Sequence, residues 1–267
     1  MVRAIVAGAG GRMGGRIISM IHKTEGITLG AAFEHPDSPA VGQDAGTAAG
    51  LESLGVSVAD SLDSVINQGD IIIDFTISEA SLKHSRIAAS HKRPIVIGTT
   101  GLASGELDEI KQLAKDFPCV LAPNMSVGIN LLYKLVDTAA KVLGDDYDVE
   151  IVEAHHRMKK DAPSGTALQL GSVIAASLGR DFDEAGLFER HGFIGERSKK
   201  EIGIQTLRAG DIVGEHTVLF GGIGERIEIV HKASSRDTFA KGAVRAALWI
   251  VEQPAGFYDM QDVLGLK

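Results

Sequence analysis

The stretch RAIVAGAGGRMGGRII, residues 3–18, decides the fold of the first part of this chain. Its apolar beginning is typical of a buried strand, and the amphipathic residues 12–23 are typical of a helix. Between them lie glycines, which permit a tight turn and let a phosphate approach the free amides at the start of a helix. This order of strand, glycine turn and helix predicts a dinucleotide-binding unit.

The spacing of these glycines departs from the G-x-G-x-x-G fingerprint. Gly8 and Gly10 take its first two positions, but Met13 stands at the third. The glycines fit G-x-x-G-x-x-G instead, at Gly8, Gly11 and Gly14. The loop is therefore a moderate signal by itself, and the context has to support it.

An acidic residue supplies that context. Glu34 follows a second apolar run, residues 27–33, some twenty positions beyond the loop, where a carboxylate can accept hydrogen bonds from an adenosine ribose. His35 comes next, where an arginine would offset the repulsion between Glu34 and the 2′-phosphate of NADPH. We therefore expect NADH, NADPH or both as cofactor, with NADH used at least as well.

The first half of the chain alternates short apolar runs with amphipathic ones, which predicts an α/β fold with a doubly wound, Rossmann-like parallel sheet. The expected strands are residues 3–8, 27–33, 56–59, 70–76, 93–100 and 119–123, and the expected helices are residues 12–23, 78–91 and 104–117.

The second half changes rhythm and predicts a separate α+β domain with a mixed or antiparallel sheet. The expected elements are helices at 126–143 and from Ser164, and strands at 148–154, 202–210, 212–220 and 226–234. A helix over residues 234–253 follows. Residues 186–205 read as a long loop, an interface or a lid.

Composition limits the possible functions. The chain has 267 residues, 44% of them hydrophobic, and a formal net charge of −8, which describes a soluble globular protein and argues against nucleic-acid binding. The only cysteine, Cys119, lies in a predicted buried strand and indicates a reducing compartment. No stretch approaches the ~20 apolar residues of a membrane helix, and no cleavage site follows the N-terminus, so we expect no membrane contact and a cytoplasmic location.

A basic cluster stands out in this acidic chain, in the stretch EAHHRMKKDAPSGTA, residues 153–167. Five of the six side chains at 155–160 can carry positive charge. The preceding strand alternates, so His155 and His156 should point to opposite faces, and we expect no metal site. We take Arg157 and Lys160 as surface or ion-pair residues.

A helix start follows the cluster directly. Pro163 disfavours helix before it, and Ser164 can cap the helix after it. The free amides of such a helix start, with the hydroxyls of Ser164 and Thr166, form an anion site that fits a carboxylate.

Five segments, in this order along the chain, closely resemble the dihydrodipicolinate reductase family. They are VAGAGGRMG at 6–14, IGTTG at 97–101, APNMSVGIN at 122–130, EAHHRMKKDAPSGTA at 153–167 and TFAKGAVRAALWI at 238–250. The resemblance implies an oxidoreductase of diaminopimelate and lysine biosynthesis. Such an enzyme uses NADH or NADPH to reduce a cyclic dicarboxylate, 4-hydroxy-tetrahydrodipicolinate, to tetrahydrodipicolinate and water.

The resemblance also implies roles for individual residues. His155 would donate and accept the proton and Lys159 would be a second proton donor, while His156, Lys159, Ser164, Gly165 and Thr166 would hold the substrate. The expected cofactor residues are Gly8, Ala9, Gly10, Gly11, Arg12 and Met13 at the pyrophosphate, Glu34 and His35 at the ribose, and Gly98, Thr99, Thr100, Ala122, Pro123, Asn124 and Met125 towards the nicotinamide.

The family further implies a discontinuous first domain and a homotetramer. Residues 1–126 and 236–267 would form the dinucleotide-binding domain, and residues 127–235 the substrate-binding and oligomerisation domain, whose sheet would assemble the tetramer. Ile77, like His35, stands where an arginine can occur in relatives that use NADPH readily.

Two other functions remain open at this point. Another two-domain nicotinamide dehydrogenase, acting on an amino-acid-derived aldehyde or keto acid, would share the first domain but would not need the segment at 153–167. A dinucleotide-sensing regulator without turnover would need neither His155 nor Lys159.

Overall fold

The computed structural model describes all residues from 1 to 267, and the chain forms two compact units. Unit 1 contains Met1–Val127 and Asp237–Lys267, and unit 2 contains Gly128–Arg236. None of the helices has the length and apolar character needed to cross a membrane.

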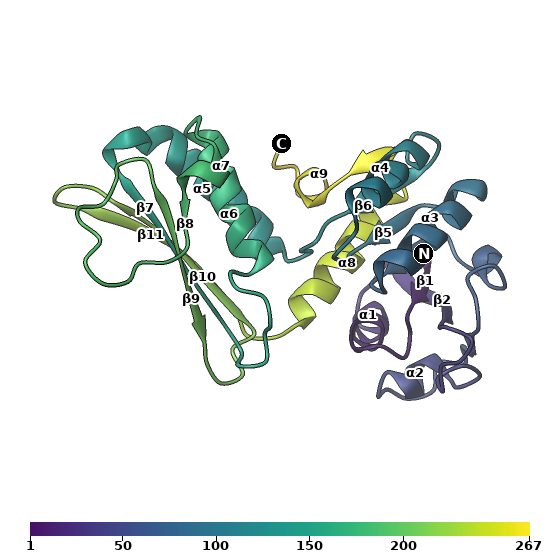
Figure 1. Ribbon diagram of the computed structural model, residues 1–267. Helices are drawn as coiled ribbons and strands as arrows, with labels where there is room; N and C mark the ends of the chain where they lie inside the picture. Colours follow the sequence, from purple (N-terminus) through teal and green to yellow (C-terminus); the bar gives the residue numbers. More distant parts are fainter. The chain divides into compact units, whose positions relative to one another are not determined.

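Unit 1 is built on a seven-stranded sheet in the order β12-β6-β5-β4-β1-β2-β3 (Figure 1). All of its strand pairs are parallel, which confirms the predicted doubly wound sheet. The strands are β1 (Val2–Ala7), β2 (Ile27–Phe33), β3 (Val58–Ala59), β4 (Ile71–Asp74), β5 (Ile95–Ile97), β6 (Pro118–Leu121) and β12 (Gly256–Tyr258).

Helices cover both faces of this sheet because its central strands are apolar on both sides. In β1, Ala4 and Val6 pack into the core under α1 and α8, whereas Ile5 and Ala7 pack into the core under α3 and α4. The helices of unit 1 are α1 (Arg12–His22), α2 (Ala45–Ala48), η1 (Ile66–Gln68), α3 (Ser78–Ser90), α4 (Ser104–Leu113), α8 (Asp237–Ile250) and α9 (Met260–Leu264).

The C-terminal segment returns to unit 1 and adds two elements that the sequence did not predict. After α8, the three residues of β12 pair in parallel with β6 and extend the sheet. Asp259 caps α9 by accepting hydrogen bonds from the amides of Gln261 and Asp262, and Gly265 ends it with a φ of +65°. Elements of three and five residues are too short to show a periodic pattern.

Unit 2 contains a mixed five-stranded sheet in the order β11-β10-β7-β9-β8. The mixed sheet agrees with the prediction, since β7 lies between β9 and β10 and pairs in parallel with β9 and antiparallel with β10. The strands are β7 (Asp148–His155), β8 (Gly186–Leu187), β9 (Ile202–Arg208), β10 (Gly214–Gly221) and β11 (Arg226–Ala233).

The helices of unit 2 lie on one face of this sheet. Apolar residues of α5 and α6 pack against alternate residues of β7, β9 and β10 in a single core. The helices are α5 (Val127–Leu143), η2 (Gly144–Asp146), α6 (Gly165–Ser177) and α7 (Phe182–Ala185).

Ion pairs hold the long segment between β8 and β9. Arg190 lies 2.7 Å from Glu150 of β7 and 2.6 Å from Glu201, and Arg197 lies 2.8 Å from Asp148. Glu150 alternates with Val149 and Ile151 of the core, so these arginines lie over the sheet face opposite the helices. The segment is therefore anchored to β7 from that side.

The glycine loop in unit 1 is held by a close approach between helix and loop. A Cβ on Gly14 would lie 2.0 Å from the carbonyl oxygen of Gly8, which itself has a φ of +68°. Gly14 therefore does the packing that the third glycine of the usual fingerprint does, although Met13 occupies the usual position.

We predict that Gly14→Ala lowers the free energy of unfolding by about 2 kcal/mol or more, because the loop carbonyl has to move away from the new methyl group. Urea unfolding of the full chain measures it. Gly15→Ala is the matched control, since a Cβ there would meet Ala49 at an ordinary 3.5 Å. It should be neutral or stabilising by about 0.5–1 kcal/mol. Equal losses in both variants would contradict this role of Gly14.

Candidate active site

The residues predicted to hold a dinucleotide lie at one edge of the sheet of unit 1. Parallel strands end at the same edge, and residues 8–11 follow β1, Glu34 follows β2, residues 98–100 follow β5 and residues 122–125 follow β6. The chain order reverses between the neighbouring strands β1 and β4. Ligands of open α/β sheets bind at such a switch point, outside the carboxyl ends of the strands.

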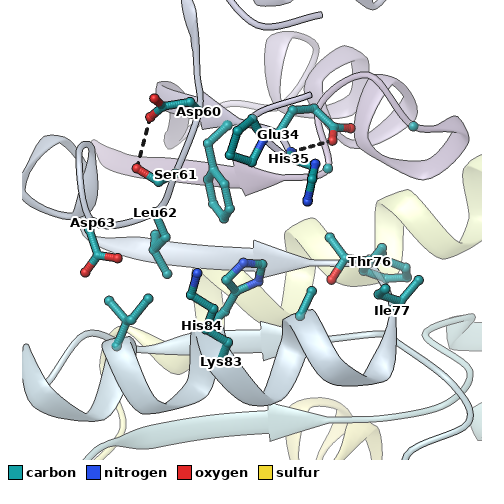
Figure 2. Close-up of a pocket in the computed structure, with 17 residues that line it drawn as sticks. Glu34, His35, Asp60, Ser61, Leu62, Asp63, Thr76, Ile77, Lys83 and His84 are labelled. Atoms are coloured by element: carbon teal, nitrogen blue, oxygen red, sulfur yellow. Dashed lines mark hydrogen bonds between the residues drawn. The ribbon is translucent and has the colours of Figure 1, made fainter. Parts of the chain in front are cut away.

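A pocket of about 440 Å³ opens at this edge (Figure 2). The glycine loop, Glu34 and His35 line one side, and Lys83 and His84 of α3 line another. The Glu34 carboxylate is fixed, because Oε1 accepts a hydrogen bond from the Gly10 amide at 3.1 Å and Oε2 accepts one from the His35 amide at 2.9 Å. The pocket thus presents a positioned carboxylate beside a glycine turn, which suits a ribose with free hydroxyls.

The sequence reasoning missed a buried pair beside this pocket. The fully buried Asp74 lies 2.7 Å from Nδ1 of His84 through Oδ2, and its Oδ1 accepts hydrogen bonds from the amide and hydroxyl of Thr76. The sequence feature that could have indicated this pair is Asp74 itself, an acid at the end of the apolar run IIID. This carboxylate fixes the turn after β4 and the ring of His84 together.

The remaining predicted cofactor residues differ in what they do. Thr99 is buried, and its hydroxyl accepts a hydrogen bond from Ser81 at 2.7 Å, so this hydroxyl joins two parts of unit 1. Thr100 is exposed. Gly98 cannot carry a Cβ, which would lie 2.2 Å from the Phe75 ring. Asn124 accepts a hydrogen bond from the Ser126 amide at 2.9 Å. The others differ in burial: the buried ones are Ala9, Ala122 and Met125, the half-buried one is Met13, and the exposed ones are Arg12 and Pro123.

The basic segment begins where β7 ends, in unit 2. His155 is the last residue of this strand and is buried, with 9% of its surface exposed, whereas His156 is half-buried just beyond it. Lys159 lies 3.0 Å from Asp161. Arg157 and Lys160 are exposed, as expected for surface residues.

Glu153 is the centre of a polar network beneath this segment and has no exposed surface. Its Oε2 lies 2.6 Å from Nδ1 of His155 and accepts a hydrogen bond from Arg208 at 2.9 Å. Its Oε1 accepts hydrogen bonds from the Ser164 amide at 3.0 Å, the Thr206 hydroxyl at 3.2 Å and Arg208 at 2.9 Å. One carboxylate thus joins β7, β9 and the start of α6 to the candidate catalytic histidine.

The start of α6 agrees with the sequence. Ser164 caps the helix, because its hydroxyl accepts a hydrogen bond from the Ala167 amide at 3.2 Å. Gly165 is exposed at the first turn. Tyr133 of α5 hydrogen-bonds Thr166, and burial raises the pKa of this phenol to about 12, so it stays protonated. Helix amides that are open to solvent can bind an anion.

Burial and charge set the protonation of the network. Burial would raise the pKa of Glu153, but the hydrogen bonds from Arg208 and His155 outweigh it and hold the pKa at about 2. Burial lowers the pKa of His155, although the Glu153 carboxylate opposes this shift. Burial and the neighbouring His155 ring lower the pKa of His216 to about 3. At neutral pH the site therefore holds one carboxylate and two neutral imidazoles.

Comparisons with known proteins connect both units of the chain to one family. The family description "Dihydrodipicolinate reductase, N-terminus" matches residues 2–125, and "Dihydrodipicolinate reductase, C-terminus" matches residues 128–264. The chain is 58% identical to the 4-hydroxy-tetrahydrodipicolinate reductase of Syntrophus aciditrophicus and 56% identical to that of Geotalea uraniireducens, in both cases over the full length of both proteins.

A solved structure extends the likeness to three dimensions. The dipicolinate-bound dihydrodipicolinate reductase from Paenisporosarcina sp. TG-14 superposes with a TM-score of 0.78 at 26% identity, over 98% of each chain. The arrangement of strands and helices described above is therefore similar to that of a dihydrodipicolinate reductase.

We predict that His216 makes the protein sensitive to mild acid. The pKa of His216 is about 3 in the folded state against an ordinary value of 6.5. As the pH falls, the unfolded chain therefore binds a proton at this residue before the folded chain does. The contribution of neutral His216 to the free energy of unfolding is complete above about pH 6.5 and is lost as the pH falls towards 3. His216→Gln should flatten the fall in the free energy of unfolding by up to about 1.4 kcal/mol per pH unit.

Urea unfolding between about pH 6.5 and 5 measures this slope, above the range where carboxylates titrate. His191→Gln is the matched control, because His191 is exposed. An unchanged slope in His216→Gln, or an equal change in the control, would contradict the prediction.

Proposed function

The chain belongs to the dihydrodipicolinate reductase family, and from this premise we propose that it reduces 4-hydroxy-tetrahydrodipicolinate to tetrahydrodipicolinate in diaminopimelate and lysine biosynthesis. In the balanced reaction, the hydroxyl group leaves together with one ring hydrogen as water, and one hydride and one proton enter the ring system. The observation that carries the proposal is the 58% identity to a named reductase over the full length of both chains. Neither an aldehyde dehydrogenase nor a regulator without turnover has comparable support.

We assign cofactor binding to unit 1, Met1–Val127 and Asp237–Lys267. Residues 8–13 would hold the pyrophosphate, and Glu34 with His35 would hold the adenosine ribose. Residues 98–100 and 122–125 would lie towards the nicotinamide. The pocket at the carboxyl ends of β1, β2 and β4 supports this assignment, since it contains both the glycine turn and the fixed Glu34 carboxylate. The nicotinamide, when bound, supplies a hydride.

We assign the substrate to unit 2, Gly128–Arg236. The start of α6, with Ser164, Gly165 and Thr166, and the side chains of His156 and Lys159 would hold its carboxylates. The concentration of positive charge in an otherwise acidic chain suits a dianion. His155 would donate and take up the proton, and Lys159 would be a second proton donor that also stabilises developing negative charge.

We also propose a cytoplasmic homotetramer assembled through the sheet of unit 2. Nearly all exposed large apolar side chains belong to this unit, and Met1 and Ile77 are the exceptions. Exposed apolar groups of this kind mark protein interfaces. Those in the segment before β9, on the sheet and in the turn between β10 and β11 are Phe188, Phe193, Ile194, Leu207, Ile223, Ile227 and Val230.

We predict that NADH supports a kcat/KM at least equal to that of NADPH at neutral pH, because a 2′-phosphate would approach the Glu34 carboxylate. Initial rates with both cofactors measure the ratio. Glu34→Gln should shift the ratio towards NADPH, since it removes the negative charge. A kcat/KM about tenfold higher for NADPH in the unaltered enzyme, or about 1.4 kcal/mol, would contradict the prediction.

We predict that His155→Ala and Lys159→Ala each lower kcat by about 100-fold or more, because each removes a proton donor. The dissociation constant of NADH should change by less than about threefold, since both residues lie outside the glycine loop. Steady-state kinetics measures kcat, and a fluorescence titration with NADH measures the dissociation constant. Lys160→Ala is the control for charge and should keep the kcat. A parallel loss of NADH affinity would mean that these residues belong to the cofactor site.

A further inference from the structure

Glu153 is a fully buried carboxylate to which the sequence analysis gives no role. Burying a charge is costly unless it is paired and hydrogen-bonded, so a buried carboxylate needs a reason. The charge is compensated by the planar fork of Arg208, which donates to both of its oxygens at 2.9 Å. Arg208 is held in turn, because it also donates to the carbonyl oxygen of Asp161 at 2.6 Å.

The network determines where the proton of His155 lies. Arg208 already donates to Oε2 of Glu153, and the low pKa of Glu153 leaves this carboxylate without a proton of its own. The 2.6 Å contact between Oε2 and Nδ1 of His155 is therefore a hydrogen bond donated by Nδ1. Neutral His155 then carries its proton on Nδ1, and Nε2 is the nitrogen that exchanges a proton.

On the other side of the ring, Nε2 lies beside Gly214 of β10, where a Cβ on the glycine would lie only 3.0 Å from it. The charged and titratable groups around the ring are Glu153 from β7, Arg208 from β9, His216 from β10 and Lys159 from the segment after β7. Glu153 is the only one of these that stabilises a positive imidazole.

We propose that Glu153 is a positioning residue for the reaction, which fixes the tautomer and the orientation of the His155 ring so that Nε2 first takes up a proton from solvent and then delivers it. The inference rests on the proposed role of His155. Arg208 keeps the carboxylate ionised and in place. A carboxylate that holds a catalytic imidazole through Nδ1 has this effect in other enzymes.

The substitution Glu153→Gln tests the tautomer directly. Oε1 accepts three hydrogen bonds from protein donors, from Ser164, Thr206 and Arg208, whereas Oε2 accepts from Arg208 and His155. The glutamine should therefore keep its oxygen at the Oε1 position and turn its amide nitrogen towards His155. Nδ1 then has to become the acceptor, and the proton has to move to Nε2.

Nitrogen-15 NMR of the full-length protein reads the tautomer without any turnover. We expect a protonated Nδ1 in the unaltered enzyme and a protonated Nε2 in Glu153→Gln. We expect kcat to fall by about 100-fold, with the KM for NADH changed by less than about threefold. The descending limb of the pH profile should move to lower pH, because Glu153 raises the pKa of His155 and the glutamine does not.

Glu150→Gln is the matched control on the same strand. Glu150 also receives hydrogen bonds from arginines, but it lies on the opposite face of the sheet. This variant should keep the tautomer of His155 and the pH profile. A protonated Nδ1 in Glu153→Gln together with an unmoved pH profile would overturn the proposal, whatever the loss of kcat.

Glu153→Asp covers the case in which the glutamine variant does not fold, since it keeps a carboxylate. Support would be a protonated Nδ1 with a kcat well above that of His155→Ala, and a protonated Nε2 with the full kcat would overturn the proposal. Failure of the proposed function itself is recognised separately. In that case the unaltered protein would not oxidise NADH with the proposed substrate, although the tautomer of His155 would still respond to Glu153→Gln.

Discussion

The ion pair between Glu153 and Arg208 is the interaction on which the organisation of unit 2 depends. The two residues come from neighbouring parallel strands, β7 and β9, and the carboxylate also binds the amide of Ser164 at the start of α6. Arg208 reaches the carbonyl oxygen of Asp161 as well. One buried charge pair thus fixes the strand that carries His155, the helix start proposed to bind a carboxylate and the segment between them. Removing Arg208 would leave the fully buried Glu153 charge without its arginine, which is strongly destabilising.

Unit 1 depends on a different constraint, the close approach of backbone to backbone around the glycine turn. Gly14 brings α1 against the carbonyl oxygen of Gly8, and the Gly10 amide then reaches the Glu34 carboxylate. The turn, the ribose acceptor and the pocket therefore form one arrangement. The two candidate sites differ in kind, because that of unit 1 is built from closely packed, uncharged backbone and that of unit 2 from charged side chains.

Much of this could be predicted from local sequence. The parallel sheet follows from alternating apolar and amphipathic runs, Glu34 follows from its distance to the glycines, and the Ser164 cap follows from Pro163 and the apolar stripe behind it. What could not be predicted depends on partners far apart in the chain. Glu153 and Arg208 are separated by 55 positions, and nothing in either segment shows that β7 lies between β9 and β10. The pairing of Asp74 with His84 likewise needed the packing of α3 on the sheet.

The most direct test of the central claim uses NADH that carries deuterium at both hydrogens of its hydride-donating carbon. The full-length protein is mixed with freshly formed condensation product of pyruvate and aspartate semialdehyde, and the product is examined by mass spectrometry. We predict tetrahydrodipicolinate that contains one deuterium, formed in step with the oxidation of the cofactor. A product without deuterium, or no oxidation although the cofactor binds, would contradict the account.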